Sequence, residues 1–321
     1  MGRILTFALA LGSTLFGLAL AEWVCRRLEI TAPIRREQAG DPENPPWGWR
    51  GVRRFGDLNT RRTRVMVLGD SYTASRGVED GEDYSTLLGR MPGVEIFSYG
   101  GEGYSTAQEL MVFRRFGPRV QPSLVLLQTS TNDFINNSAE LESTSLINNN
   151  LKVRPYLEAG RMVLRYPRFG GSLRARLVND SALGRRIFYA LDQGRAWFAL
   201  RGWLDTVENE IGPDLGGHAG FRRSVETTET LLVMLRDEAR PAPLMVFPAD
   251  GIGPDAPFRL ELAALCARQG IPFLESLPDV LDAADSPEDS VYLKDDPHWS
   301  ARGHALAADE LIRWVSPALK H

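Results

Sequence analysis

The chain of 321 residues has few of the residues that mark disulfide, metal or nucleic-acid proteins. Two cysteines, Cys25 and Cys266, support neither a disulfide framework nor a cysteine-based zinc site. Four scattered histidines give no histidine-rich metal cluster, so we expect no metal and no cofactor. The net charge of −4 lacks the basic excess of nucleic-acid-binding proteins, so we expect no nucleic-acid partner.

Hydrophobic residues at 43% and charged residues at 24% are typical of globular proteins and argue against general disorder. A chain of this length buries a large core as one sizeable domain or two small ones.

The longest uncharged stretch, Ile4 to Ala21, lies near the N-terminus. Its length matches the roughly 17 to 20 apolar residues that a membrane-spanning helix needs. Trp23 follows at the position of an interfacial aromatic residue, which favours a retained anchor. The alternative is export after cleavage, because the stretch ends in an A-x-A pattern that a signal peptidase reads. An ordinary buried helix is the third interpretation.

This stretch divides the chain into a signal anchor or signal peptide (1–30), a proline-rich linker (31–63) and one folded domain (64–321). Both membrane interpretations place the folded domain outside the cytoplasm, which we expect to be the periplasm. Arg26 and Arg27 oppose that location by the positive-inside rule, so the orientation stays open.

Short apolar, β-branched runs alternate with stretches of helical periodicity in the folded domain, which indicates a mostly parallel sheet covered on both faces. Loops after such strands share one edge, where ligands bind. We expect strands at 64–68, 94–99, 124–129, 244–247 and 271–274, and helices at 84–90, 106–116, 227–240, 258–269 and 304–315.

The section from about 137 to 221 breaks this alternation and is read as an insertion near the active edge. It holds an arginine-rich, helical piece from Ser172 to Trp203. A solvated helical face is one explanation. Contact with an anionic polymer or with lipid headgroups is the other.

Short polar motifs supply the groups of a serine nucleophile site. Ser71 follows a predicted strand and precedes a predicted helix, and a serine needs a base to remove its proton during attack. His298 is the candidate base, and Asp295, three residues earlier, is the candidate orienter of its imidazole. As single residues they have ordinary roles, such as helix capping by Ser71 or a solvated loop histidine.

The same motifs supply donors for the oxyanion that forms in acyl transfer. The amides of Ser71 and Gly103 and the side chain of Asn132 are the three candidates. Asp133 is expected to brace the loop. His304 is expected to be a structural residue at the start of the last helix.

The flanks VMVLGDSYT, GGEGYSTAQEL and DPHWSARGH resemble the SGNH superfamily of GDSL-type esterases and lipases. The resemblance implies a flavodoxin-like three-layer α/β/α sandwich with a five-stranded parallel sheet. It covers about 64–136 and 244–315. Tyr72 replaces the usual leucine of the first block. Ser130 replaces the usual glycine of the third block, where a side chain beside the oxyanion site bears on the size of the substrate.

These observations lead to a carboxylester hydrolase, an acyl or acetyl esterase, that forms an acyl-enzyme on Ser71. Its expected substrate is a small-molecule or glycan-linked acyl ester. The alternative is an O-acyltransferase that modifies cell-surface polysaccharide. A distant alternative treats the loop from Gly69 to Ser75 as a phosphate cradle of a flavin-binding protein.

Overall fold

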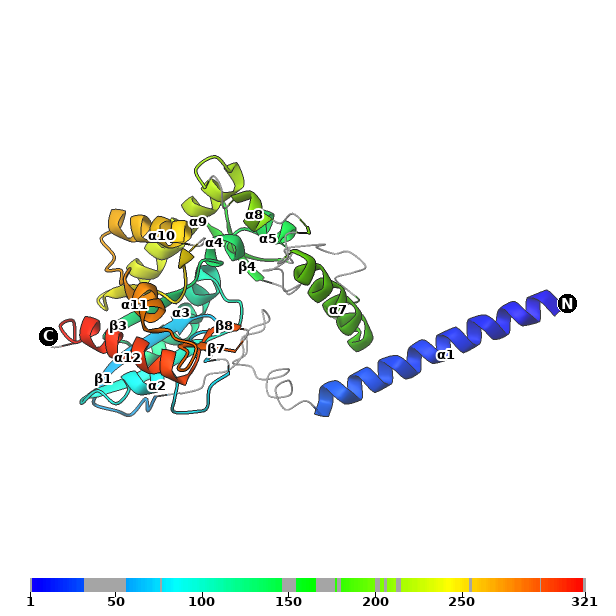
Figure 1. Cartoon of the computed structure of the whole chain (residues 1–321), viewed down its shortest axis with the longest axis horizontal. Coiled ribbons are helices and arrows are strands. Elements are labelled where there is room, and N and C mark those ends of the chain that lie inside the picture. Colours follow the sequence, from blue (N-terminus) through cyan, green and yellow to red (C-terminus); the bar gives the residue numbers. More distant parts are fainter. Residues whose placement is uncertain are drawn as a thin grey trace.

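The computed structural model describes residues 2–31, 56–75, 77–145, 154–165, 177, 180–199, 203–204, 207–211, 215–253, 256–294 and 296–319. A long helix, α1 (Gly2–Thr31), extends away from the α/β body, and the two termini lie at opposite ends of the view in Figure 1.

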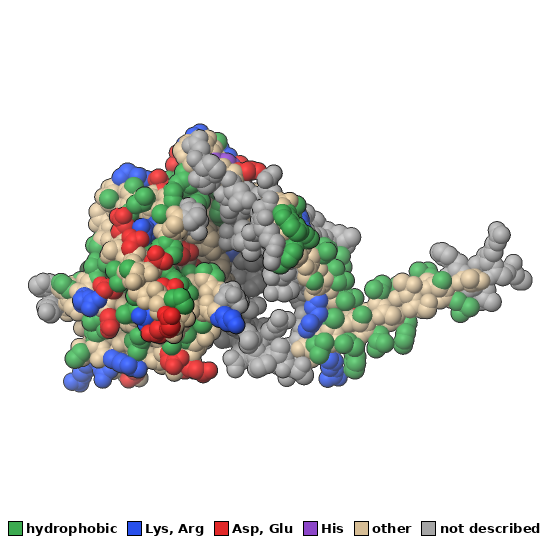
Figure 2. All heavy atoms as spheres, in the orientation of Figure 1, with side chains coloured by type: hydrophobic (Ala, Val, Ile, Leu, Met, Phe, Trp, Pro, Cys, Tyr) green, Lys and Arg blue, Asp and Glu red, His purple; other side chains and the backbone are tan. Residues whose placement is uncertain are grey.

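Helix α1 carries the apolar stretch that the sequence singled out. Its segment Leu9–Leu28 is long and apolar enough to cross a membrane, a test that signal sequences also pass. Only 6% of that window is buried. Figure 2 shows hydrophobic side chains along much of the helix.

The body is built on a parallel sheet with the strand order β2-β1-β3-β6, which confirms the predicted fold class. Its strands are buried along nearly their whole length because helices cover both faces. The strands are β1 (Thr63–Gly69), β2 (Val94–Gly100), β3 (Leu124–Thr129) and β6 (Leu244–Pro248).

Within the part of the chain that the structure describes, the sheet has four strands where we expected five. The expected fifth segment contributes a single parallel bridge between Val246 and Phe273. The amide of Leu274 donates to the carbonyl of Val246 at 3.0 Å, but the preceding Pro272 has no N–H to extend the ladder. The chain then enters α11 (Leu277–Ala284).

Alternate side chains of β1 face two separate cores, so the domain has three layers. Met66 and Leu68 pack with α3 (Thr106–Val120), α9 (Ala219–Ala239) and α10 (Ala256–Arg268). Val65 and Val67 pack on the other face with α11, α2 (Tyr84–Leu88) and α12 (Ala301–Val315).

The insertion contains a β-hairpin that the sequence did not predict, as well as helices. Much of the predicted helical piece from 172 to 203 falls within α7, and 172–176, 178–179 and 200–202 lie outside the described residues. Its elements are α5 (Ala139–Thr144), β4 (Arg154–Glu158), β5 (Arg161–Arg165), α7 (Ala182–Ala199) and α8 (Val207–Ile211), with α4 (Asp133–Asn136) just before them.

A buried ion pair attaches the hairpin to the body. The guanidinium of Arg154 lies 3.2 Å from the carboxylate of Glu142, and both side chains are fully buried. Arg154 also donates to Gln108 of α3 at 2.7 Å, and Tyr156 donates to Glu142 at 2.7 Å. Burial raises the pKa of Glu142 to about 7, and the charge of Arg154 opposes that rise.

We predict that Arg154→Ala lowers the free energy of unfolding by about 3–5 kcal/mol, because it leaves a buried carboxyl group without its partner. Chemical denaturation measures the change. Arg161→Ala, at an exposed position of the same hairpin, is the control and is expected to change stability by less than about 0.5 kcal/mol. Equal losses in the two variants would contradict a structural role for the ion pair.

Candidate active site

Three of the predicted motifs meet at the carboxyl edge of the sheet. Strand β1 lies between β2 and β3, so the loops that follow these strands are neighbours. The amide of Gly101 donates to the carbonyl of Gly69 at 3.2 Å, and the amide of Asp70 donates to the side chain of Gln128 at 3.0 Å. These bonds tie the loop that carries Ser71 to both of its neighbours.

Asp70 is the buried connection between the first and third loops. Its carboxylate accepts hydrogen bonds from the hydroxyl of Ser130 and from the amide of Tyr72, the latter at 2.9 Å. Burial raises the pKa of Asp70, and these hydrogen bonds oppose the rise. Ser130 is buried and its hydroxyl donates to Asp70, and the effect of this residue on substrate size stays a prediction.

The nucleophile and base that the sequence singled out are in contact. The hydroxyl of Ser71 lies 2.7 Å from Nε2 of His298, across 227 positions of the chain. We expected Ser71 to precede a helix, but it opens an isolated turn closed by the amide of Ala74 on the carbonyl of Asp70 at 2.9 Å. The next helix, α2, begins only at Tyr84.

The other imidazole nitrogen, Nδ1 of His298, is in contact with the carboxylate of Asp296. Sequence reasoning assigned this place to Asp295, which lies outside the described residues. The same carboxylate of Asp296 accepts from the backbone amide of His298 at 2.9 Å, so a local turn brings it to the ring. The preference of aspartate for the amide two residues later was the available sequence signal.

Tyr72 holds the base from the other side, a role that sequence reasoning missed. Its ring centroid lies 4.8 Å from that of His298 and 5.1 Å from that of Trp299. Its hydroxyl donates to the carbonyl of Pro297 at 3.2 Å. Burial raises the pKa of Tyr72 well above its usual range, so the hydroxyl remains a donor. The departure from leucine therefore ties the nucleophile loop to the segment of the base.

The segment after His298 packs the short hairpin that carries this residue against the body. His298 lies on β8 (Asp296–Trp299), which pairs with β7 (Tyr292–Leu293). Ser300 caps α12 by accepting from the amide of Gly303 at 3.2 Å. A side chain at Gly303 would come within 2.2 Å of the carbonyl of Val291, so glycine is required there. His304 is buried and structural, as expected, and accepts from the amide of Tyr84.

The expected oxyanion residues lie on the two loops beside Ser71. Gly103, in the loop after β2, has a φ of 68°, a conformation that glycine adopts without strain. Asn132 lies directly before α4, and the amide of Asp133 donates to the carbonyl of Ser130 at 3.1 Å. Burial raises the pKa of Asp133 well above its usual range, and the charges of Asp70 and Asp250 add to the rise.

This arrangement suits nucleophilic chemistry better than phosphate binding. A phosphate cradle needs several free backbone amides, but those of Asp70, Tyr72, Ala74 and Ser75 donate within the protein. A hydroxyl, an imidazole and a carboxylate in series are the groups that activate a serine.

Neither a family model nor a curated protein matches the chain. Among solved structures, it is similar to TesA, at 12% identity and a TM-score of 0.45, over 80% of this chain and 98% of that chain. It is similar to a G-D-S-L family lipolytic protein from Veillonella parvula, at 14% and 0.42, over 79% and 98%. It is also similar to the esterase EstA from Pseudoalteromonas sp., at 12% and 0.43, over 81% and 100%.

Proposed function

We propose that the protein is a serine-dependent carboxylester hydrolase of the SGNH type. One observation carries the proposal: the hydroxyl of Ser71 lies 2.7 Å from Nε2 of His298, whose other ring nitrogen contacts Asp296. The site lies at the carboxyl edge of a parallel sheet, where such folds bind ligands.

In the first half of the reaction, Oγ of Ser71 attacks the acyl carbon of the ester while its proton passes to Nε2 of His298. The carboxylate of Asp296 holds the Nδ1 proton and stabilises the imidazolium that forms. Collapse of the tetrahedral intermediate breaks the bond to the alkoxy oxygen. The leaving alcohol takes the proton from His298, and the acyl group remains on Ser71.

The tetrahedral intermediate carries a negative oxygen that needs donors already in place. We assign this role to the amides of Ser71 and Gly103 and to the side chain of Asn132. The hydrogen bonds that tie their loops together support this assignment, because donors fixed before the reaction need no reorganisation during it. Each such donor contributes about 3–4 kcal/mol to transition-state stabilisation.

In the second half, water gives a proton to His298 and attacks the acyl-enzyme, which releases the acid and restores Ser71. A sugar hydroxyl in place of water would make the protein an O-acyltransferase with the same residues. We propose a small-molecule or glycan-linked acyl ester as the substrate. We also propose that α1 anchors the domain to a membrane, with the site outside the cytoplasm.

A fluorophosphonate probe tests the nucleophile, because it forms a stable adduct only with an activated serine. We predict that wild-type protein is labelled, that Ser71→Ala abolishes labelling, and that His298→Ala slows it on the order of 10³-fold or more. Gel fluorescence measures the adduct. His304→Ala controls for a histidine that only packs, and is read per folded molecule. Equal labelling of wild type, Ser71→Ala and His298→Ala would overturn the mechanism.

Asp296→Asn and Asp295→Asn, two isosteric changes at adjacent positions, test which aspartate orients the imidazole of His298. We predict that Asp296→Asn slows hydrolysis of a soluble aryl ester on the order of 10⁴-fold, because the imidazole loses its orienting carboxylate. Asp295→Asn is the matched control and should stay within about tenfold of wild type. The reverse order would transfer the role to Asp295, as the sequence spacing first indicated.

The acceptor is tested by product analysis with an acetylated donor ester, with and without a polysaccharide. For a hydrolase, we expect free acetate in equal amounts in both reactions, measured by chromatography. Acetylated polysaccharide, absent with Ser71→Ala, would instead identify a transferase and leave the acyl-enzyme chemistry intact.

A further inference from the structure

We propose that α7, with Trp203 just beyond it, forms a second membrane contact that lies on the surface of an anionic bilayer beside α1. We call this surface the α7 patch; it consists of Ile187, Leu191, Trp197, Phe198 and Trp203. The inference goes beyond the proposed esterase activity and rests on α1 as the membrane anchor.

A polar joint fixes the start of α7 against α1. The carboxylate of Glu22 accepts from the hydroxyl of Ser181 at 2.8 Å and from the amides of Ala182 and Leu183 at 3.0 and 2.9 Å. These are amides at the N-terminus of α7, which has no intrahelical acceptors for them. Arg26 adds a bond to the carbonyl of Asp180 at 2.7 Å. Glu22 of α1 therefore caps α7.

The joint lies where the uncharged part of α1 ends. The uncharged stretch from Ile4 to Ala21 extends about 27 Å as a helix, close to the roughly 30 Å of a bilayer core. Glu22 and Arg26 follow at the depth of the headgroups. Trp23 is exposed there, with the guanidinium of Arg27 5.4 Å from the centroid of its ring. The joint thus holds the first turn of α7 at the membrane boundary.

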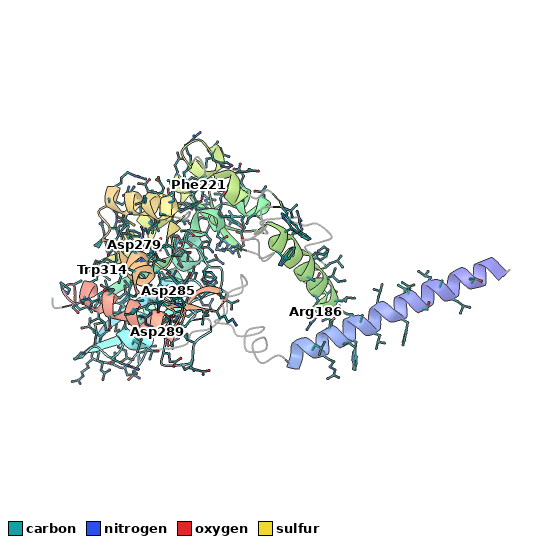
Figure 3. The ribbon with its side chains drawn as sticks, in the orientation of Figure 1. Arg186, Phe221, Asp279, Asp285, Asp289 and Trp314 are labelled. Atoms are coloured by element: carbon teal, nitrogen blue, oxygen red, sulfur yellow. The ribbon has the colours of Figure 1, made fainter. Side chains whose placement is uncertain are left out.

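An exposed apolar stripe runs along α7. Ile187, Leu191 and Phe198 are all exposed, and helical geometry places them within about 40° of one another around the axis. A soluble domain rarely leaves such a row of large apolar side chains in water. Arg186 and Arg195 are exposed on opposite sides of the stripe, and Figure 3 shows Arg186 on the part of α7 nearer α1.

Three aromatic side chains extend the stripe at the far end of α7. Trp197, Phe198 and Trp203 lie with their ring centroids 4.9 to 5.7 Å apart, and all three are exposed. Trp203 is the most exposed at 65%. Tryptophan at such a position is typical of the membrane interface, where the ring is apolar and its N–H meets water or headgroups.

A bilayer surface fits these features better than a protein partner does. An interfacial helix has an apolar face with large aromatic or aliphatic residues and arginines beside it, as α7 has. Anionic headgroups attract the arginines at both edges. The anchor already holds the patch near the bilayer, so contact needs no further association in solution. The α7 patch then keeps the domain close to the membrane.

The test uses full-length protein in vesicles of equal parts phosphatidylethanolamine and phosphatidylglycerol. A fluorophore is attached to a single cysteine at Leu15, Leu191 or Leu260, whose exposed fractions are similar at 58%, 55% and 51%. These positions report on α1, on the α7 patch and on α10 of the body. Cys25 is replaced by alanine. Cys266 is retained because it is fully buried, and burial raises the pKa of its thiol to about 12.

We expect lipids brominated on their acyl chains to quench the probes at 15 and 191 several-fold more than the probe at 260. Quenching at 15 with none at 191 beyond that at 260 would overturn the proposal, and is also the result expected if the patch binds a protein. No quenching at 15 would remove its premise, the anchor. Equal quenching at all three positions would overturn it as well.

Charge reversal tests the arginines separately. Arg186→Glu with Arg195→Glu is expected to lower quenching at 191 several-fold and leave quenching at 15 unchanged; no change at 191 would count against an anionic surface. Hydrolysis of a soluble ester serves as an independent readout, because none of these positions lies in the proposed site. If the probe at 191 is quenched no more than the probe at 260 while hydrolysis is normal, this inference alone is refuted. If hydrolysis is absent in every variant while the probe at 191 is quenched, the proposed function alone is refuted.

Discussion

A buried carboxylate, that of Asp70, is the contact on which the geometry of the site depends. It links the loop after β1 to the loop after β3, accepting from Ser130 on one side and from the amide of Tyr72 on the other. A carboxylate in such a place is costly unless its oxygens are bonded, and burial indeed raises its pKa. Ser71 lies between Asp70 and Tyr72 in the chain, so this contact constrains the backbone that carries its hydroxyl.

The nine residues from Asp296 to His304 make most of the contacts that position the imidazole of His298. Asp296 forms a local turn with the amide of His298 and contacts its ring, and the completely buried Trp299 anchors the hairpin. The close approach at Gly303 then seats α12 against the same hairpin. The imidazole is thereby held between packed side chains, with Tyr72 against its face. In the proposed mechanism, a base fixed in this way loses little entropy on reaching the transition state.

The molecule has two regions with different physical character. The three-layer body buries its apolar side chains on both faces of the sheet, whereas α1 and α7 expose theirs. Exposure of these apolar side chains to water is unfavourable, but at a bilayer the same side chains would contact lipid. Figure 1 shows the long helix α1 extending away from this body.

The sequence alone determined the alternation of strands and helices, the apolar stretch of α1 and the candidate nucleophile and base, because each has a local signature in periodicity or motif. Tertiary structure decided what local patterns cannot carry. The motif spacing indicated Asp295, but a local turn brings Asp296 to the imidazole. The expected fifth strand forms a single bridge beside Pro272. The hydrogen bond from Tyr72 to Pro297 joins residues 225 positions apart. The capping of α7 by Glu22 joins residues about 160 positions apart. Such contacts exist only once the chain has folded.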